Sequence, residues 1–238
     1  MGKFWSLFKG EILRLWRYKI TFFGLLVSLI WLVIIVLVSE VEANALLPQI
    51  LMLDSGLMAI ILLAAAYYYE KQEGTMKPVL VSPTSPIILL MSKVAGALLG
   101  SVISLVLIWL TMLIVHGTMF PILLALGIIV IVTIAHLSLG YVLIYLSHDF
   151  MDLLIKYTFV VLILFVPIIL VNLDIIPSSW QWIALFSPTF AGQQALSHLW
   201  LPLSDGTFIV TLIFLIGYPT ILFPLYVLPK FRKEAISA

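Results

Sequence analysis

Side chains able to do chemistry are few in this chain of 238 residues, and they are scattered. The sequence contains no cysteine, and its four histidines fall in different segments. No His-Glu-x-x-His pair or other clustered ligand set is present, so we predict no metal site. A phosphate-binding Gly-x-x-x-x-Gly-Lys-Ser/Thr run is also absent, and no motif suggests a Ser/His/Asp triad. The sequence therefore gives no positive evidence for catalysis or nucleotide binding within this chain.

Three polar side chains stand out because they interrupt or end long apolar runs: Asp54, His136 and Asn172. Polar groups inside a membrane are costly and mark candidate pathways for a substrate. Asp54 could line a central pathway, pair across a dimer, or be wetted at the membrane surface if its span starts later. His136 could relay protons or simply hydrogen-bond to a neighbouring helix, and Asn172 could cap a helix end. We keep all three as candidates for a substrate pathway.

The composition predicts that lipid is part of the solvent. Hydrophobic residues make up 63% of the chain and charged residues 10%, whereas soluble domains average roughly 45–50% and about 25%. A core of this size cannot hide the excess. The formal net charge of +1 argues against nucleic acid as a partner. We therefore expect an all-α membrane protein, with residues 1–238 forming a single transmembrane domain.

Six apolar runs are each long enough to cross the hydrocarbon core, which takes about 20 helical residues. The third and fourth runs are longer than a span requires, so we expect them to tilt or protrude. The third also carries Gly96, Gly100 and Ser104 at four-residue spacing, a pattern that permits close helix packing. The predicted spans are 20–39, 48–69, 87–115, 121–147, 153–173 and 207–228.

The basic residues predict the orientation of the spans. With six crossings and the amino terminus inside, all 12 Lys and Arg residues lie at or near a cytoplasmic end. The outer loops then hold Glu40, Glu42, Asp174 and Asp205 and no basic residue. Positive charge is retained on the cytoplasmic side during insertion. We therefore predict an inner or plasma membrane protein with both termini in the cytoplasm.

Two segments outside the spans have amphipathic patterns. Within residues 1–19, apolar side chains at Phe4, Phe8, Ile12 and Leu15 recur at helical spacing between basic residues. This pattern favours an interfacial helix on the membrane surface, although a plain cytoplasmic flank is the alternative.

Residues 174–206 form the second such segment, in which two aromatic, amphipathic pieces are separated by Ser187-Pro188. Each piece is too short to span, so we predict two short re-entrant helices in the outer leaflet before the last span. An ordinary outer loop lying on the membrane is the alternative.

The longest polar interruption is the stretch 70–86, which follows the second span. A short helix starting near Glu70 would place acidic residues at its amino-terminal end, where they favour the helix dipole. Gly74 would then allow a turn at positive φ, and Pro78 would end the helix. We predict a rigid cytoplasmic knob that contacts a partner, although a passive turn is the alternative.

The residues of this loop resemble those of the membrane subunits of ABC-2 type transporters, also called type V exporters. Those subunits have six spans, an amino-terminal interfacial helix and broken helices before the last span, with which Ser187-Pro188 agrees. Pro78 departs from the family pattern because it shortens the loop helix. The matching positions are Glu70, Lys71, Glu73, Gly74, Thr75, Pro83 and, in the next span, Lys93.

The resemblance implies a permease subunit and not an enzyme. In that family the loop docks on a separate ATPase chain, so Glu70, Glu73, Gly74 and Thr75 would form the coupling contact. ATP and magnesium would bind that partner, with no cofactor in this chain, and a second permease subunit would complete the pathway. The implied function is export of amphiphiles from a bacterial cell, and the small size of the chain favours small amphipathic compounds such as drugs or antibiotics. The alternative is a membrane-embedded enzyme or assembly factor for haem or lipid that is not coupled to ATP.

Overall fold

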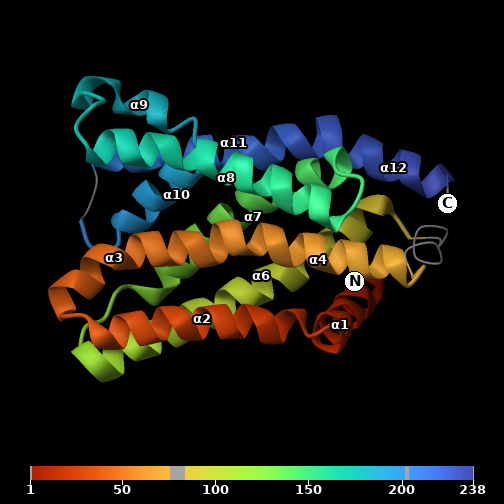
Figure 1. Ribbon diagram of the computed structural model, residues 1–238, viewed down its shortest axis with the longest axis horizontal. Helices are drawn as coiled ribbons and strands as arrows, with labels where there is room; N and C mark the ends of the chain where they lie inside the picture. Colours follow the sequence, from red (N-terminus) through yellow and green to blue (C-terminus); the bar gives the residue numbers. More distant parts are fainter. Residues whose placement is uncertain (1, 76–83, 202–203, 238) are drawn as a thin grey trace.

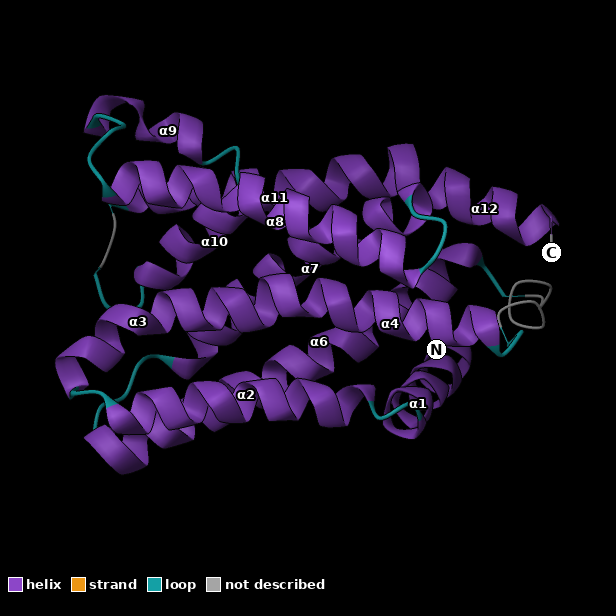
Figure 2. Cartoon of the chain, viewed as in Figure 1, coloured by secondary structure: helices purple, strands orange, loops and turns teal. Residues whose placement is uncertain are grey.

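The computed structural model of the chain describes residues 2–75, 84–201 and 204–237. These residues form helices and connecting turns, and no strand occurs among them (Figure 2). Most of the helices run along the long axis of the molecule (Figure 1). The first part of the chain contains α1 (Gly2–Arg17), α2 (Ile20–Leu37), α3 (Glu40–Met52), the π-helix η1 (Leu53–Met58), α4 (Ala59–Gln72), α6 (Pro86–Thr111) and the π-helix η2 (Met112–His116).

The second part of the chain adds further long helices and a group of short ones. The elements are α7 (Ile122–Leu146), α8 (Phe150–Asn172), the 3-10 turn η3 (Ser178–Trp180), α9 (Gln181–Ala184), α10 (Pro188–Ser197), α11 (Asp205–Leu222), the π-helix η4 (Phe223–Val227) and α12 (Leu228–Ser237). Of the short helices, α9 and α10 lie towards the end of the molecule opposite to the two termini, whereas α12 carries the carboxyl terminus (Figure 1).

Six helical runs in the described part of the chain are long and apolar enough to cross a membrane, which confirms the predicted number. All of them except the second agree with the predicted boundaries within a few residues. The last run extends further than predicted, to Lys233. The spans are Ile20–Leu37, Glu40–Gln72, Pro86–His116, Ile122–Leu146, Phe150–Asn172 and Gly206–Lys233.

The start of the second span was predicted wrongly. The helix begins at Glu40 and not at Pro48, so the expected outer loop over residues 40–47 is helical. The cause is a capping box, in which Ser39 accepts a hydrogen bond from the Glu42 backbone and the Glu42 carboxylate accepts one from the Ser39 backbone. Glu40 and Glu42 also favour the helix dipole in the first turn. Pro48 is accommodated inside α3.

Helix α7 is the centre of the bundle. It packs against α4, α6, α10 and α11, and residues Ala135, His136 and Leu137 are fully buried. By contrast, most side chains of α8 and α11 point away from the bundle. Phe159 and Ile163 of α8 are examples. These outward faces are apolar, as expected for helices that meet lipid.

The amino-terminal helix α1 forms as predicted and packs against α2 and α6. Its aromatic residues Trp5 and Trp16 remain exposed, which suits a helix at a membrane surface. Its interfacial position itself stays a prediction. Both ends of the described chain lie at the same end of the bundle as the carboxyl-terminal end of α4 (Figure 1).

The segment before the last span contains two helical pieces separated at Ser187-Pro188, although the first piece is shorter than expected. Ser187 accepts a hydrogen bond from the Phe190 backbone, and Pro188 occupies the first turn of α10. Helix α10 packs between α3, α7, α8 and α11 and buries Ala191 and Ala195 completely. Its placement in the outer leaflet stays a prediction.

Candidate coupling site and membrane cavity

Helix α4 ends at the predicted coupling loop. Gly74 adopts a φ of 68°, as expected for a turn that requires a residue without a Cβ. The Glu73 and Thr75 backbone amides donate to the Tyr69 and Glu70 carbonyls at 2.9 and 3.1 Å, which satisfies the carbonyls at the helix end. The prediction that a new helix starts near Glu70 is wrong, because Glu70 lies in the last turn of α4. Pro78 and Pro83 lie outside the described residues.

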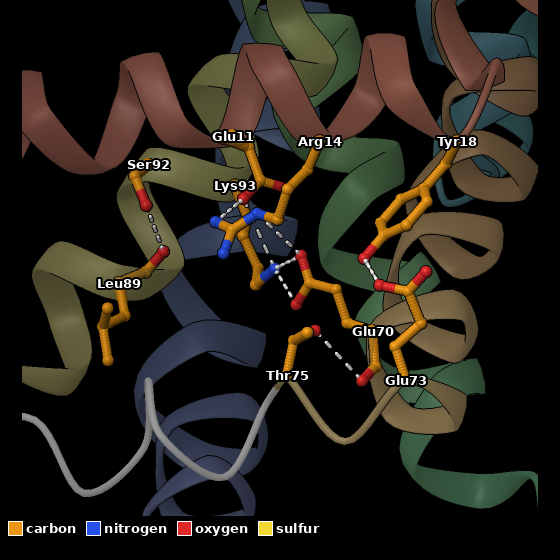
Figure 3. A network of polar contacts seen from close by, with 9 residues as sticks. All are labelled: Glu11, Arg14, Tyr18, Glu70, Glu73, Thr75, Leu89, Ser92 and Lys93. Atoms are coloured by element: carbon orange, nitrogen blue, oxygen red, sulfur yellow. Dashed lines mark hydrogen bonds and ion pairs between the residues drawn. The ribbon is translucent and has the colours of Figure 1, made fainter.

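Glu70 is the centre of a buried ion network that joins three helices (Figure 3). Lys93 of α6 donates to both carboxylate oxygens of Glu70 at 2.6 Å and lies 3.5 Å from the Glu11 carboxylate of α1. Arg14 donates to Glu11 at 2.5 Å, and its Nε lies 3.4 Å from Glu70. The network therefore fastens α1 and α6 to the end of α4.

The four charges of this network balance, since two carboxylates face two cations. Glu11 and Glu70 are each 2% exposed, so neither could remain ionised there without a partner. Burial disfavours the charged form of Arg14, but Glu11 and Glu70 outweigh it and raise the Arg14 pKa. An acid in the last turn of α4 opposes the helix dipole, and Lys93 offsets this.

The predicted coupling residues divide into a buried one and an exposed turn. Glu70 does not face a partner, because its side chain is enclosed by Lys93 and Arg14. Glu73 and Gly74 are exposed, and Thr75 is partly exposed. The Tyr18 hydroxyl donates a hydrogen bond of 2.6 Å to the Glu73 carboxylate. Burial and this hydrogen bond raise the pKa of Tyr18. A partner could therefore reach Glu73 and Gly74 fully and Thr75 in part.

Asp54 lies deep in the bundle and not at a wetted span end. It is 8% exposed and belongs to the π-helical turn η1, so the alternative of a later span start with Asp54 wetted at the surface does not hold. The earlier start of the helix is the reason. Asp54 Oδ1 lies 3.2 Å from the Ser28 hydroxyl, which lies 2.9 Å from the Ser104 hydroxyl. Ser28 and Ser104 are near the middles of their own spans, so Asp54 lies level with the middles of these spans.

Asp54 lines a cavity of about 280 Å³ between α1, α2, η1, α4 and α6. Small side chains create it, as Gly24, Ser28, Gly100 and Ser101 form part of its wall. The close helix packing predicted for Gly96, Gly100 and Ser104 occurs only in part. A Cβ at Gly96 would lie 2.8 Å from the Glu11 side chain, whereas one at Gly100 would meet nothing within 4 Å.

The other two pathway candidates are not part of this cavity. His136 is fully buried, and its Nδ1 pairs with the Val132 carbonyl of its own helix at 2.8 Å and not with a neighbouring helix. Its Nε2 has no hydrogen-bond partner among the described residues. Asn172 is exposed in the last turn of α8. The structure therefore does not bring Asp54, His136 and Asn172 together into one pathway.

The sequence-based prediction missed two members of the ion network, Glu11 and Arg14. A signal existed, because Lys93 lies inside an apolar run and requires an acidic partner. Glu11 is the sole acid of the amino-terminal segment 1–19. In the part of the chain that the structure describes, no group of three His, Asp or Glu side chains could hold a metal ion.

A bundle of six apolar spans, with an internal cavity and an exposed turn at one end, has the architecture of a transport permease. The family model for the ABC-2 type transporter matches residues 2–201, from α1 through α10. The chain therefore belongs to the ABC-2 type transporter family, and the resemblance seen in its loop is confirmed. No curated protein matches the chain by sequence.

Proposed function

We propose that this membrane domain is the permease subunit of an ATP-driven exporter that moves small amphipathic compounds out of the cell. ATP and magnesium bind a separate ATPase chain, which docks on the exposed turn at Glu73, Gly74 and Thr75. The observation that carries the proposal is the position of this turn, which directly follows the buried ion network of Glu70 and Lys93.

A displacement of the turn reaches the membrane through that network. Glu70 lies within five residues of Thr75 and is bound to Lys93 and Arg14, so α4, α6 and α1 respond together. Coupling over such a distance requires a chain of fixed contacts between packed elements. The ion pairs supply those contacts at the point where the spans begin, whereas a passive turn would not need them.

Two further parts of the proposal rest on the family and on charge. A second permease subunit, identical or homologous, completes the pathway, because an ABC-2 type membrane subunit is expected to form one of the two halves of an exporter. The end of the bundle that carries both termini and the coupling turn faces the cytoplasm, since Lys and Arg are retained there during insertion. The cavity lined by Asp54 has a largely apolar wall, which suits an amphipathic cargo.

Copurification tests the docking contact. Glu73→Ala removes an exposed charge, and Gly74→Val places a side chain at a φ of 68° that it adopts poorly. Both variants should insert and fold, but the amount of ATPase retained should fall, because a charged hydrogen bond contributes about 1.5–3 kcal/mol, and less at an exposed rim.

Glu40→Ala is the matched control, because Glu40 is an exposed glutamate at the opposite end of the same span. It should retain the ATPase at the wild-type level. Normal retention by both Glu73→Ala and Gly74→Val would refute the docking contact.

A further inference from the structure

The cavity beside Asp54 has a feature that the proposed coupling site does not use. We infer that it binds a small amphipathic cation, with the cationic group at Asp54 and the apolar body against Leu62 and Ile103. This inference rests on the proposed function in one respect, since it names the chemical class of the exported compound. The site lies within one chain, between α1, α2, η1, α4 and α6.

The charge of Asp54 is the first argument. Among the residues that the structure describes, Asp54 takes part in no ion pair, and a neutral hydroxyl of Ser28 is its neighbour. Lys93 and Glu11 also line this cavity. Lys93 does not neutralise Asp54, because it holds Glu70 and lies eleven positions from Ser104 on α6, which is about 16 Å along the helix. A buried carboxylate that stays ionised requires a compensating charge, and a ligand cation supplies it.

The shape and lining of the cavity are the second argument. Its volume of about 280 Å³ is close to the lower end of small-molecule sites. Leu25, Met58, Leu62 and Ile103 make most of the nearby wall apolar. The space beside Gly100 is open, so the small residue there widens the cavity and does not serve a helix contact. A lipid tail could fill such a space but could not neutralise the charge of Asp54.

The depth of Asp54 indicates whether the cation that binds there belongs to a membrane lipid or to a free amine. The ammonium group of a lipid headgroup lies at the bilayer surface. Asp54 lies level with Ser28 and Ser104, which are near the middles of the α2 and α6 spans. A cation that reaches Asp54 must therefore enter the hydrocarbon region with an apolar body of its own. This requirement selects a compact hydrophobic amine.

Direct binding to the complete chain in phosphatidylcholine nanodiscs tests the inference. The probes share one hydrocarbon cage and differ in charge: 1-aminoadamantane, 1-adamantanol and adamantane-1-carboxylate. Equilibrium dialysis against empty nanodiscs corrects for partition into lipid. We expect the amine to bind most tightly, the alcohol at least about tenfold more weakly, as for loss of one charged contact, and the carboxylate not at all. Equal binding of amine and alcohol would overturn the role of charge.

Three variants locate the site. Asp54→Asn keeps the size of the side chain and should reduce amine affinity to that of the alcohol while leaving alcohol binding unchanged, which also shows that the variant is folded. Gly100→Leu fills the cavity and should abolish binding of both probes. Gly127→Leu is the control, because Gly127 is exposed on α7 with nothing near its Cβ position, and should bind as the wild type. Wild-type amine affinity in Asp54→Asn or Gly100→Leu would refute the site.

The binding measurement requires neither ATP nor an ATPase, so it is independent of the proposed function. Failure to bind the amine by a chain that still retains its ATPase through the Glu73 turn would refute this inference alone. Selective amine binding by a chain that retains no ATPase would support the cavity and count against the exporter.

Discussion

At the scale of single residues, the interior of this protein is organised by the pairing of Lys93 with Glu70. Each ion alone would be strongly disfavoured in an apolar bundle. Together with Glu11 and Arg14 they form a neutral group that α1, α4 and α6 build jointly. The network is therefore a structural requirement as well as the proposed link between the turn and the spans.

Removal of one partner should be far more damaging than removal of both. Lys93→Met leaves Glu70 buried without its closest cation and should lower the free energy of unfolding by about 3–5 kcal/mol. The double change Lys93→Met with Glu70→Gln removes both charges and should recover much of that loss. Unfolding curves in detergent would measure both effects.

Lys156→Met is the matched control for this prediction. Lys156 pairs with Asp152 at 2.7 Å but its side chain is 38% exposed, so its loss should cost no more than about 1 kcal/mol. An equal loss in Lys93→Met and Lys156→Met would show that the buried network contributes little.

The residues of the network could be predicted only in part. Glu70 and Lys93 were found because they match a family pattern, but the sequence does not show that they touch. Glu11 was missed because α1 reads as a surface helix, and its contact with α6 depends on a glycine at position 96. Burial of a charge depends on tertiary packing, and the sequence indicates only that Lys93 requires an acidic partner, not which acid supplies it.

At the scale of elements, the π-helical turn η1 divides the second span and brings Gly56 against His136. A Cβ at Gly56 would lie 3.1 Å from two atoms of the His136 ring, which is fully buried and fixed by Val132. Gly56→Ala should therefore lower the free energy of unfolding by about 1–3 kcal/mol, as overpacked cores do.

Gly127→Ala provides the comparison for Gly56→Ala, because nothing lies within 4 Å of its Cβ position. In an exposed helix interior alanine is favoured over glycine by about 0.5–1 kcal/mol, so this variant should be as stable as the wild type or more so. Thermal unfolding midpoints of the two purified variants would measure the difference. Equal midpoints would mean that His136 can move aside.

The spans themselves could be predicted well, since hydropathy over about 20 residues reports the lipid environment directly. The exception was the second span, where the apolar run suggested a start at residue 48 and the Ser39–Glu42 capping box set the real one. The cavity could not be predicted. The pattern of Gly96, Gly100 and Ser104 permits another helix to pack against any of the three positions. In the structure α1 packs against Gly96 and leaves the space beside Gly100 unfilled.

At the scale of the whole molecule, the two ends of the bundle should lie on opposite sides of the membrane. The native chain has no cysteine, so single cysteines can report accessibility. In sealed, right-side-out cells, Val41→Cys and Ile175→Cys should react with an impermeant thiol reagent, and Gln72→Cys should not. All three positions are exposed. Labelling of Gln72→Cys from outside would invert the proposed orientation.

The central claim is that ATP hydrolysis on a partner drives this chain through the turn after α4. The most direct measurement is ATP-dependent accumulation of a hydrophobic amine in inside-out vesicles that contain the complete transporter. The account predicts accumulation with ATP by the wild type and by Glu40→Ala, and its loss in Glu73→Ala and Gly74→Val at equal protein levels. Accumulation at the wild-type rate in both turn variants, or without ATP, would contradict it.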